Sequence, residues 1–544
     1  MRTKKYHFWL AASIFVAIAF SCFGFKLAFQ SPYTIQDDAR QHVFWLQKFS
    51  DRYLFTNDLI ADYFSSVAPL GYKFLYWFAN FLGVKPFLFS KILPVLLGII
   101  TTIYIYFVTI ALFPVPFAGF MASLLLNQNL WMLDDLVSGT PRAFFYVLFL
   151  GFIYYLLRQR LIPCLLFIIL QGLFYPQVVL ISAGILIINL IKQKSSYFYF
   201  TGLVLALGIL AIYKLKTADF SQVMSLTTAK QLPEFYAGGR NTFFLDNPWL
   251  FWLAGPRSGF FPREWQYVLL CSFGLSLPWL TRYPRRFPLV KKIKPQITIV
   301  GQILLVSLAL FFLSHLLLFQ LHLPSRYSQH TWRIIIALVD GITLAILLNS
   351  ITKNITHYQK LFKPLITAIA IGALLYPTYA VQAYPYRLGY VTGTAPELYQ
   401  FLEQQPKDIL IASLSKEADF IPSLAQRSVL VAEEYSIPYH LDYYQPIRRR
   451  TQDLITAQYS LNQAKVNQFI QKYHIDLWLL DKNAFQVEHL LHNPWLRQFK
   501  PETENAILSL KQTKKHILAT KVAECKIFQT RELVVLDTKC IKLN

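Results

Sequence analysis

Two pairs of adjacent carboxylates are the first residues in this chain with evident chemical potential. Asp37 and Asp38 lie in the stretch QDDARQHVFW, directly after the first apolar segment, and Asp134 and Asp135 lie in LDDLVSGTPRAF, between two later ones. The helix dipole alone favours aspartates at a helix start. The recurrence of the pair beside apolar segments instead favours general acid–base chemistry, or a divalent metal such as Mg²⁺ or Mn²⁺ held by carboxylate oxygens.

A basic face accompanies these acids further along the chain. In LPSRYSQHTWRIII, a helix that begins at Pro324 or Ser325 carries Arg326, His330 and Arg333 on one side, beside its positive end. Such a face suits a phosphate group held at membrane level, and Arg142, just after the second acidic pair, could assist. Snorkelling towards lipid headgroups is the alternative interpretation for these arginines.

Composition indicates the solvent in which these residues work. Of the 544 residues, 55% are hydrophobic and 16% aromatic, which is typical of a chain built largely in a lipid bilayer. The formal charge of +23 would suggest a nucleic-acid partner in a soluble protein. Here the lysines and arginines gather in short runs between apolar segments, where they act as topology signals, so no nucleic-acid partner is expected.

The pattern of apolar segments predicts about eleven membrane segments. The first, over 7–29, follows MRTKK and is interpreted as a retained signal anchor with the N-terminus in the cytoplasm. The segment 161–191 is interrupted by Tyr175-Pro176 and predicts two short helices. The other segments lie over 87–112, 114–131, 143–157, 198–215, 264–281, 296–322, 333–351 and 365–384.

The segments assigned to the outer side hold the acidic pairs and the basic face. They are 30–86, 132–142, 217–263, 321–332 and the chain after about 385. From Gln36 onward, apolar residues at helical spacing predict a helix that lies along the membrane interface. The segment 217–263 contains YAGGR and PRSG, whose glycines suit either a mobile lid or an ordinary long loop.

The C-terminal part, 386–544, changes character. Short apolar strands such as DILIAS and IDLWLLD alternate with helix-like polar stretches, which predicts an α/β domain outside the membrane. No glycine follows Gly393, so a phosphate-cradling glycine loop is absent and no nucleotide cofactor is expected. Cys525 and Cys540 could pair in an oxidising compartment. The predicted fold is a multi-span α-helical membrane domain over 1–385 followed by this α/β domain.

The acidic pair followed by Arg40, the later stretch NDLIADYFSSVAPLGYKFLYWFA, the second acidic site and the many spans resemble the GT-C superfamily of integral-membrane glycosyltransferases. The nearer resemblance is to the protein O-mannosyltransferase and aminoarabinose transferase branch, and it covers about 350 N-terminal residues. It implies that Asp37 or Asp38, with Asp37 preferred, is the catalytic carboxylate. It further implies that Asp134 or Asp135 is the second acidic site and that Arg326 is a ligand of a lipid phosphate. The WWD-type signature of oligosaccharyltransferases is absent, which disfavours asparagine glycosylation.

Together these features predict an enzyme of the plasma membrane that acts on its outer face. It would transfer a sugar from a polyprenyl-phosphate donor to a hydroxyl of a lipid, glycan or protein acceptor, by inverting displacement with an aspartate base. A divalent metal on Asp37, Asp38, Asp134 and Asp135 is left open. A lipid or polysaccharide transporter or flippase, or a non-catalytic envelope assembly protein, is the alternative.

Overall fold

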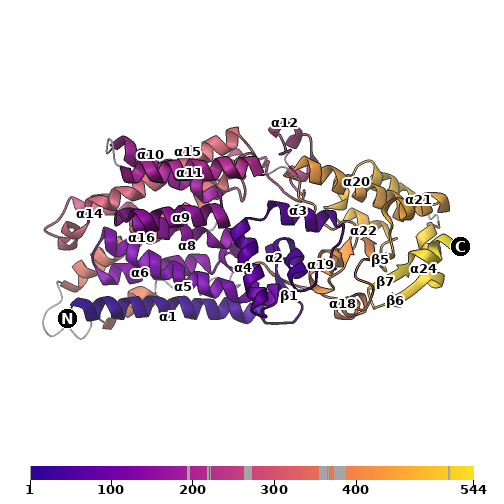
Figure 1. Ribbon diagram of the computed structural model, residues 1–544, viewed down its shortest axis with the longest axis horizontal. Coiled ribbons are helices and arrows are strands. Elements are labelled where there is room, and N and C mark those ends of the chain that lie inside the picture. Colours follow the sequence, from indigo (N-terminus) through magenta and orange to yellow (C-terminus); the bar gives the residue numbers. More distant parts are fainter. Residues whose placement is uncertain are drawn as a thin grey trace.

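The computed structural model is an elongated molecule with a helical bundle at one end and a mixed α/β domain at the other (Figure 1). The N-terminus lies at the far end of the bundle, and the C-terminus lies in the α/β domain. Short helices of the segment that follows the first long helix lie between the two parts. The structure describes residues 2–192, 197–216, 220, 222–262, 272–353, 364–365, 367–372, 388–512 and 515–543.

The bundle is built from the apolar segments of the sequence. Its helices are α1 (Arg2–Ala28), α5 (Pro86–Leu112), α6 (Pro116–Leu130), α8 (Phe145–Leu157), α9 (Leu161–Phe174), α10 (Gln177–Lys192), α11 (Tyr197–Lys216), α14 (Leu277–Thr281), α15 (Thr298–Leu316) and α16 (Ser325–Lys353). Within the described part of the chain, five helices are long and apolar enough to cross a membrane: α1, α5, α11, α15 and α16. Most of the predicted span 365–384 and the first half of 264–281 lie outside the described residues.

The predicted break in the segment 161–191 is confirmed. Helix α9 ends at Phe174 and α10 begins at Gln177, on either side of Tyr175-Pro176. Proline lacks a backbone donor and restricts the residue before it, so the helix stops there. The two halves and α8 are each 13 to 16 residues long, shorter than a full span.

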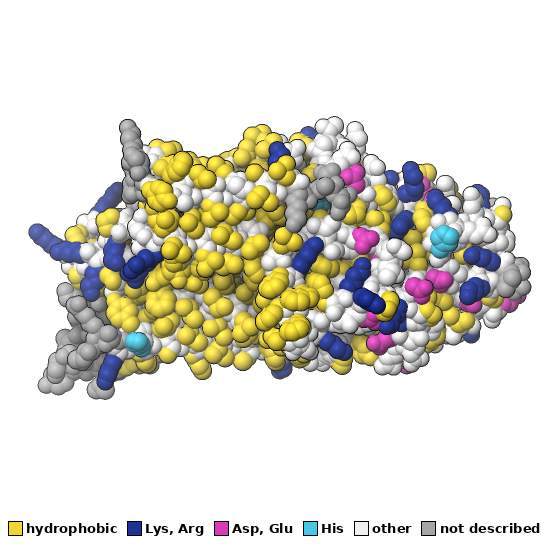
Figure 2. All heavy atoms as spheres, in the orientation of Figure 1, with side chains coloured by type: hydrophobic (Ala, Val, Ile, Leu, Met, Phe, Trp, Pro, Cys, Tyr) yellow, Lys and Arg dark blue, Asp and Glu magenta, His cyan; other side chains and the backbone are white. Residues whose placement is uncertain are grey.

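Close helix packing holds the bundle together around α6 and α16. A Cβ built on Gly341 of α16 would lie 2.6 Å from the backbone nitrogen of Ala122 in α6, so glycine is what permits this approach. The outer faces of the bundle carry hydrophobic side chains, while charged side chains gather on the α/β domain and at the opposite end of the bundle (Figure 2). This surface is that of an integral membrane protein.

The segment after α1 folds into β1 (Thr34–Gln36), α2 (Asp37–His42), η1 (Phe44–Phe49), α3 (Leu59–Val67) and α4 (Leu70–Phe81). The predicted helix start at the acidic pair is confirmed. The prediction that this helix lies along the membrane interface is wrong, because Ala39, Val43 and Leu46 are buried inside the protein. Phe44 instead contacts the ring of Tyr435 in the α/β domain. The apolar periodicity reflects burial against protein, which periodicity alone cannot distinguish from burial in lipid.

The predicted C-terminal α/β structure is confirmed. Its sheet has the order β4-β3-β5-β7-β6, with β3 parallel to β4 and β5, and β7 antiparallel to β5 and β6. The strands are β3 (Leu410–Ser413), β4 (Ser428–Val429), β5 (Leu477–Asp481), β6 (Lys526–Gln529) and β7 (Leu533–Asp537). The helices are α18 (Pro396–Glu403), α19 (Ile421–Leu424), α20 (Leu441–Gln458), α21 (Gln463–Tyr473), α22 (Val487–Leu491), α23 (Glu502–Lys511), α24 (Ile517–Cys525) and α25 (Thr538–Leu543).

One covalent link lies within the C-terminal domain, and two backbone links join distant parts of the chain. Cys525 and Cys540 form a disulfide, as their positions suggested. A short strand before the α/β domain, β2 (Tyr390–Thr392), pairs antiparallel with β1, which directly precedes the acidic pair. The backbone N–H of Asp37 also donates to the carbonyl of Gly389 at 2.7 Å. The start of the α/β domain therefore fixes the start of α2.

Candidate functional site

Helix α2 directs its two acidic side chains to different partners. The Gln36 side chain caps the helix by accepting from the backbone N–H of Ala39 at 3.2 Å. One turn into the helix, Arg40 forms an ion pair with Asp37. Asp38 instead forms an ion pair with Arg142, which lies in η2 (Pro141–Phe144), just before α8. The neighbouring carboxylates thus belong to two separate charged clusters.

Arg142 is the centre of the first cluster. Besides Asp38, its guanidinium lies 3.1 Å from an oxygen of Asp134 and 3.2 Å from one of Asp135. Both aspartates lie in α7 (Asp134–Val137), a one-turn helix just before η2. Three carboxylates from two segments therefore converge on one guanidinium: one member of the first acidic pair and both members of the second.

The basic face of α16 meets the same cluster. The helix begins at Ser325, as predicted, and Arg326 lies 3.6 Å from Asp135 Oδ1. Arg333 forms an ion pair with Asp135 and donates to the hydroxyl of Tyr146 at 2.5 Å. His330 Nδ1 lies 3.5 Å from Asp135 Oδ2. All of the residues predicted for a donor-phosphate site are thus within contact distance of Asp135.

These basic residues differ in how open they are. The side chain of Arg326 is 26% exposed, against 11% for Arg142 and 5% for Arg333. Because Arg333 and Asp135 are almost fully buried together, each neutralises a charge that would otherwise be costly to bury. Arg326 is the arginine of this cluster with the most accessible guanidinium.

The carboxylates of the cluster differ in proton affinity. Burial opposes ionisation of Asp135, but Arg333, His330, Arg142 and Arg326 together hold its pKa well below the ordinary value. For Asp38, burial is similarly outweighed by Arg142, and its pKa is lowered. Burial prevails at Asp134, with Asp135 and Asp38 adding repulsion, and raises its pKa. Asp134 is therefore the member of the cluster that takes up a proton most readily.

Two histidines near the cluster were not predicted from the sequence. Burial lowers the pKa of His42 to about 4, although the charge of Asp38 opposes the shift. Burial also lowers the pKa of His322 to about 3, and Arg326 contributes. Both imidazoles are therefore neutral at physiological pH. The signal for His42 was available in the sequence, since it follows Asp38 by four residues on one short helix.

The carboxylates as arranged do not fit a divalent cation. Metal ions held in this way need several oxygen ligands directed at one point. Between Asp38, Asp134 and Asp135 that point is taken by the Arg142 guanidinium. Asp37 turns to Arg40. Among the described residues, no group of three or more potential ligands is arranged to hold a metal.

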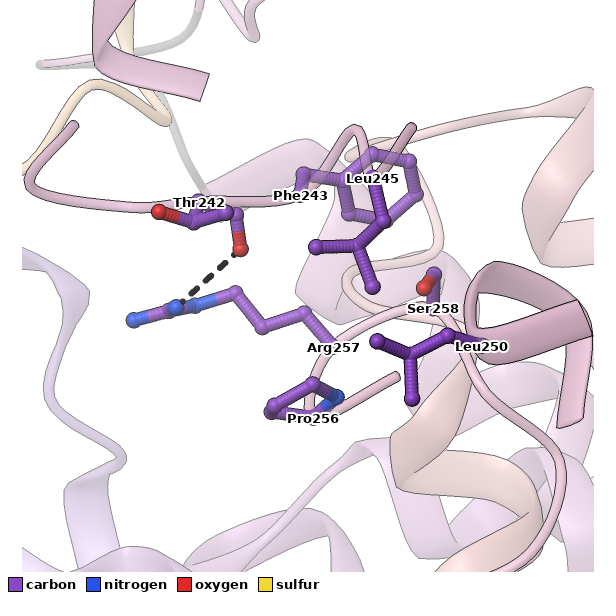
Figure 3. A pocket seen from close by; sticks show the side chains of 7 residues that line it. All are labelled: Thr242, Phe243, Leu245, Leu250, Pro256, Arg257 and Ser258. Carbon is purple, nitrogen blue, oxygen red and sulfur yellow. Dashed lines mark hydrogen bonds between the residues drawn. The ribbon is translucent and has the colours of Figure 1, made fainter. Parts of the chain in front are cut away.

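The segment over 222–262 packs against α15 and the start of α16. It contains α12 (Leu226–Ala229), η3 (Pro233–Phe235) and η4 (Leu250–Ala254). A cavity of about 220 Å³ opens in it, lined by Thr242, Phe243, Leu245, Leu250, Pro256, Arg257 and Ser258 (Figure 3). Arg257 donates to the Thr242 carbonyl at 3.2 Å, and its own carbonyl accepts from the backbone N–H of Ser325. The segment is therefore attached directly to the start of α16.

Comparison with known proteins identifies the fold. The chain matches the crystal structure of the Archaeoglobus fulgidus oligosaccharyltransferase tethered with an acceptor peptide, with a TM-score of 0.51 and 12% identity, over 90% of this chain and 72% of that one. The apo form of the same enzyme matches with a TM-score of 0.51 and 11% identity, over the same shares of both chains. The chain has the GT-C fold.

A third structure with the GT-C fold, the same archaeal enzyme in complex with Zn and sulfate, matches with a TM-score of 0.50 and 12% identity, over 90% of this chain and 70% of that one. No family model and no curated protein matches the sequence. The similarity to solved structures therefore establishes the GT-C fold, while the chemistry has to be argued from the site itself.

Proposed function

We propose that this protein is a glycosyltransferase that moves a sugar from a polyprenyl-phosphate donor to an acceptor hydroxyl on the extracytoplasmic face of the membrane. The observation that carries the proposal is the partly exposed Arg326 guanidinium at the head of an apolar helix, beside three clustered carboxylates. A cation at the end of a membrane-spanning helix suits a phosphate whose lipid tail lies in the bilayer.

In this proposal Arg326 binds the donor phosphate and stabilises its negative charge as it leaves. Arg142 assists from the centre of the cluster. Arg333 and His330 act indirectly, since their contacts with Asp135 and Tyr146 hold that side of the site in place. Asp134, whose pKa burial raises, can take up a proton when the phosphate arrives, which keeps the site close to neutral.

The base is proposed to be Asp37. Its side chain is 43% exposed, against 30% for Asp38, and Asp38 is tied to Arg142 with a lowered pKa, which makes it a weaker base. The acceptor oxygen attacks the anomeric carbon and gives its proton to Asp37. The bond from that carbon to the phosphate oxygen breaks, and polyprenyl phosphate leaves with the electron pair. One displacement inverts the anomeric configuration.

Two features support an extracytoplasmic site. The disulfide between Cys525 and Cys540 is typical of oxidising compartments. Lysines and arginines such as Arg158, Lys192 and Lys292 lie at the ends of helices that lead away from the α/β domain, which fits a cytoplasmic side. Figure 2 shows basic side chains at that end of the bundle.

The fold neighbour was solved with a tethered acceptor peptide, so a protein acceptor is one candidate for this chain, beside lipid and glycan acceptors.

The proposal is tested with the purified protein in lipid vesicles and a panel of synthetic polyprenyl-phosphate hexoses and N-acetylhexosamines. Release of polyprenyl phosphate in the presence of a total membrane-lipid and glycan extract is the measurement. We expect Asp37→Asn to slow release by about 10²–10⁴-fold, the usual contribution of a general base. We expect Asp38→Asn to slow release less than Asp37→Asn, because Asp38 is paired with Arg142 and is not the proposed base.

Asp62→Asn is the matched control, since Asp62 is an exposed aspartate of the same outer segment whose partner is Lys48 at 3.8 Å. It should leave release unchanged. A wild-type protein that consumes no donor of the panel, or an Asp37→Asn variant as fast as wild type, would contradict the proposal.

A further inference from the structure

A second charged cluster lies where α2 meets the α/β domain, and the proposed reaction uses only one of its members, Asp37. Glu434 is its centre and is buried, as is Arg40 of α2. The other members are Asp37 of α2, Asp419 of η8 (Lys416–Asp419) and Arg240 of the outer segment. Three parts of the chain, each distant in sequence from the others, therefore contribute charges to one buried place.

Each carboxylate oxygen of Glu434 has its own partners. Oε2 accepts from Arg40 Nη2 at 2.7 Å. Oε1 lies 3.0 Å from Arg240 Nη2 and also accepts from the side chain of Gln41, the residue after Arg40. One side chain of the α/β domain thus holds two consecutive residues of the helix that bears Asp37 and Asp38.

The backbone around Glu434 strengthens the same junction. Its carbonyl accepts from Gln41 Nε2 and from Arg240 Nη2, both at 3.1 Å, and its N–H donates to Asp419 Oδ1 at 2.8 Å. Arg240 reaches this place from a tight turn, where a Cβ on Gly239 would lie 2.4 Å from the carbonyl oxygen of Glu234. The position of Glu434 is therefore fixed by backbone bonds, and it can impose its geometry on α2.

Arg40 connects Glu434 to Asp37. It bonds Asp37 within α2 and Glu434 across the junction, and its guanidinium lies 4.7 Å from the ring centroid of Phe420. A buried arginine held on three sides has little freedom to turn, so the Asp37 carboxylate that it contacts is oriented as well.

We infer that Glu434 is a positioning residue for the proposed reaction: through Arg40 and Gln41 it fixes α2, and thereby the direction of the Asp37 carboxylate. The α/β domain is then a structural part of the active site. This inference rests on the proposed function for its catalytic consequence, whereas the effect on α2 can be measured without a substrate.

The first test measures hydrogen–deuterium exchange in the full-length protein. We expect the amides of α2 to exchange at least about 10-fold faster in Glu434→Ala than in wild type, and to an intermediate extent in Glu434→Gln, which keeps one acceptor oxygen. Glu433→Ala is the control, because the neighbouring residue contributes its backbone carbonyl to Arg240, which the substitution retains. Wild-type exchange of α2 in Glu434→Ala would overturn the inference. If Glu434→Ala loses protection throughout the bundle, the exchange of the α2 amides in Glu434→Gln is compared with wild type instead. Wild-type exchange in that variant would then overturn the inference.

The second test measures transfer. Glu434→Ala should lower kcat by about 10–100-fold with KM for the polyprenyl-phosphate donor nearly unchanged, since the donor contacts lie at Arg326. Glu434→Gln should restore part of the rate. A wild type that transfers no sugar would overturn the proposed function alone, because the exchange comparison still tests α2. An active wild type with Glu434→Ala as fast as Glu433→Ala would overturn the positioning role alone.

Discussion

Arg326 and Arg333 lie on the same helix seven residues apart, yet their guanidiniums have different surroundings. Arg333 is buried against Asp135 and Tyr146, whereas Arg326 is partly exposed and reaches Asp135 at 3.6 Å. An arginine paired with a buried carboxylate stabilises the fold, whereas a partly exposed arginine can bind a ligand. Substitution of Arg333 should therefore lower stability, and substitution of Arg326 should weaken ligand binding.

Arg326→Ala is expected to weaken binding of polyprenyl phosphate by about 10–100-fold, which corresponds to loss of one charged hydrogen bond of roughly 1.5–3 kcal/mol. The thermal stability should change little. Binding is measured by titrating undecaprenyl phosphate into the protein in nanodiscs. Arg285→Ala, which removes an exposed arginine from the turn between α14 and η5, is the control for general charge loss. Equal affinities of wild type and Arg326→Ala would exclude Arg326 as the phosphate ligand.

Arg333→Ala is expected to lower the free energy of unfolding by about 3–5 kcal/mol, because it leaves the Asp135 carboxylate buried without its closest partner. Chemical denaturation in detergent measures the change, with Arg326→Ala as the reference. A stable Arg333→Ala variant that fails to bind undecaprenyl phosphate would reverse the roles assigned to the two arginines.

At this scale residue type alone selected residues that the structure brings together, Asp38, Asp134, Asp135, Arg142 and Arg326. The pairing between them was not predicted. Whether Asp37 or Asp38 meets Arg142 depends on how α2 is rotated, and that rotation is set by Glu434 and Gly389 from the far end of the chain. No local periodicity encodes such contacts.

Among the elements, the link between β2 and α2 depends on one backbone conformation. Gly389 has φ +70°, and a Cβ there would lie 2.9 Å from Nε2 of Gln36, the residue that caps α2. Any other residue would have to adopt a left-handed conformation and also displace the cap.

Gly389→Ala should therefore reduce both stability, by about 1–2 kcal/mol, and transfer, by about 10-fold or more. Gly83→Ala is a close control, because Gly83 also has a positive φ, +84°, but has open space around it. The Gly83→Ala variant carries the same backbone strain but does not displace the cap of α2. Thermal unfolding and donor turnover of the two variants are compared. Equal losses of turnover would show that strain alone, and not the displaced cap, is responsible.

The elements themselves were largely predictable. Long apolar runs, the proline break after Tyr175 and the helix start at Ser325 all follow from local sequence. The surroundings of α2 were not predictable, because a helix buried by a remote domain and a helix buried in lipid present the same apolar face. The aromatic contact between Phe44 and Tyr435 joins residues almost 400 positions apart in the sequence.

At the scale of the whole molecule, the junction of the bundle and the α/β domain should respond to pH. Burial raises the pKa of Glu434 to about 8 and that of Asp419 to about 6, although Arg240 and Arg40 oppose both shifts. The ordinary values are 4.5 and 3.8, so the folded protein binds protons that the unfolded chain has released. The charged groups facing Glu434 are Asp37, Arg40, Arg240, Asp419 and Glu433, with the Tyr435 hydroxyl nearby.

The stabilisation from protonation of Glu434 and Asp419 is fully present below about pH 4 and declines as pH rises towards 8. We expect the melting temperature to fall by on the order of 2–4 °C between pH 6 and 9. The double substitution Asp419→Asn with Glu434→Gln should flatten this profile. Differential scanning fluorimetry of both proteins across the range is the measurement, and a wild-type melting temperature that rises over this range would contradict the assignment.

The pairing of β1 with β2 joins residues 358 positions apart, Thr34 and Thr392 among them. During synthesis β1 is made early, whereas its partner strand follows only after the described helices of the bundle. Until then α2 lacks the strand and the Gly389 carbonyl that hold its start. Under the proposed function, a chain that ends before β2 would keep both acidic pairs but lack these contacts, so only a chain that includes β2 would transfer sugar.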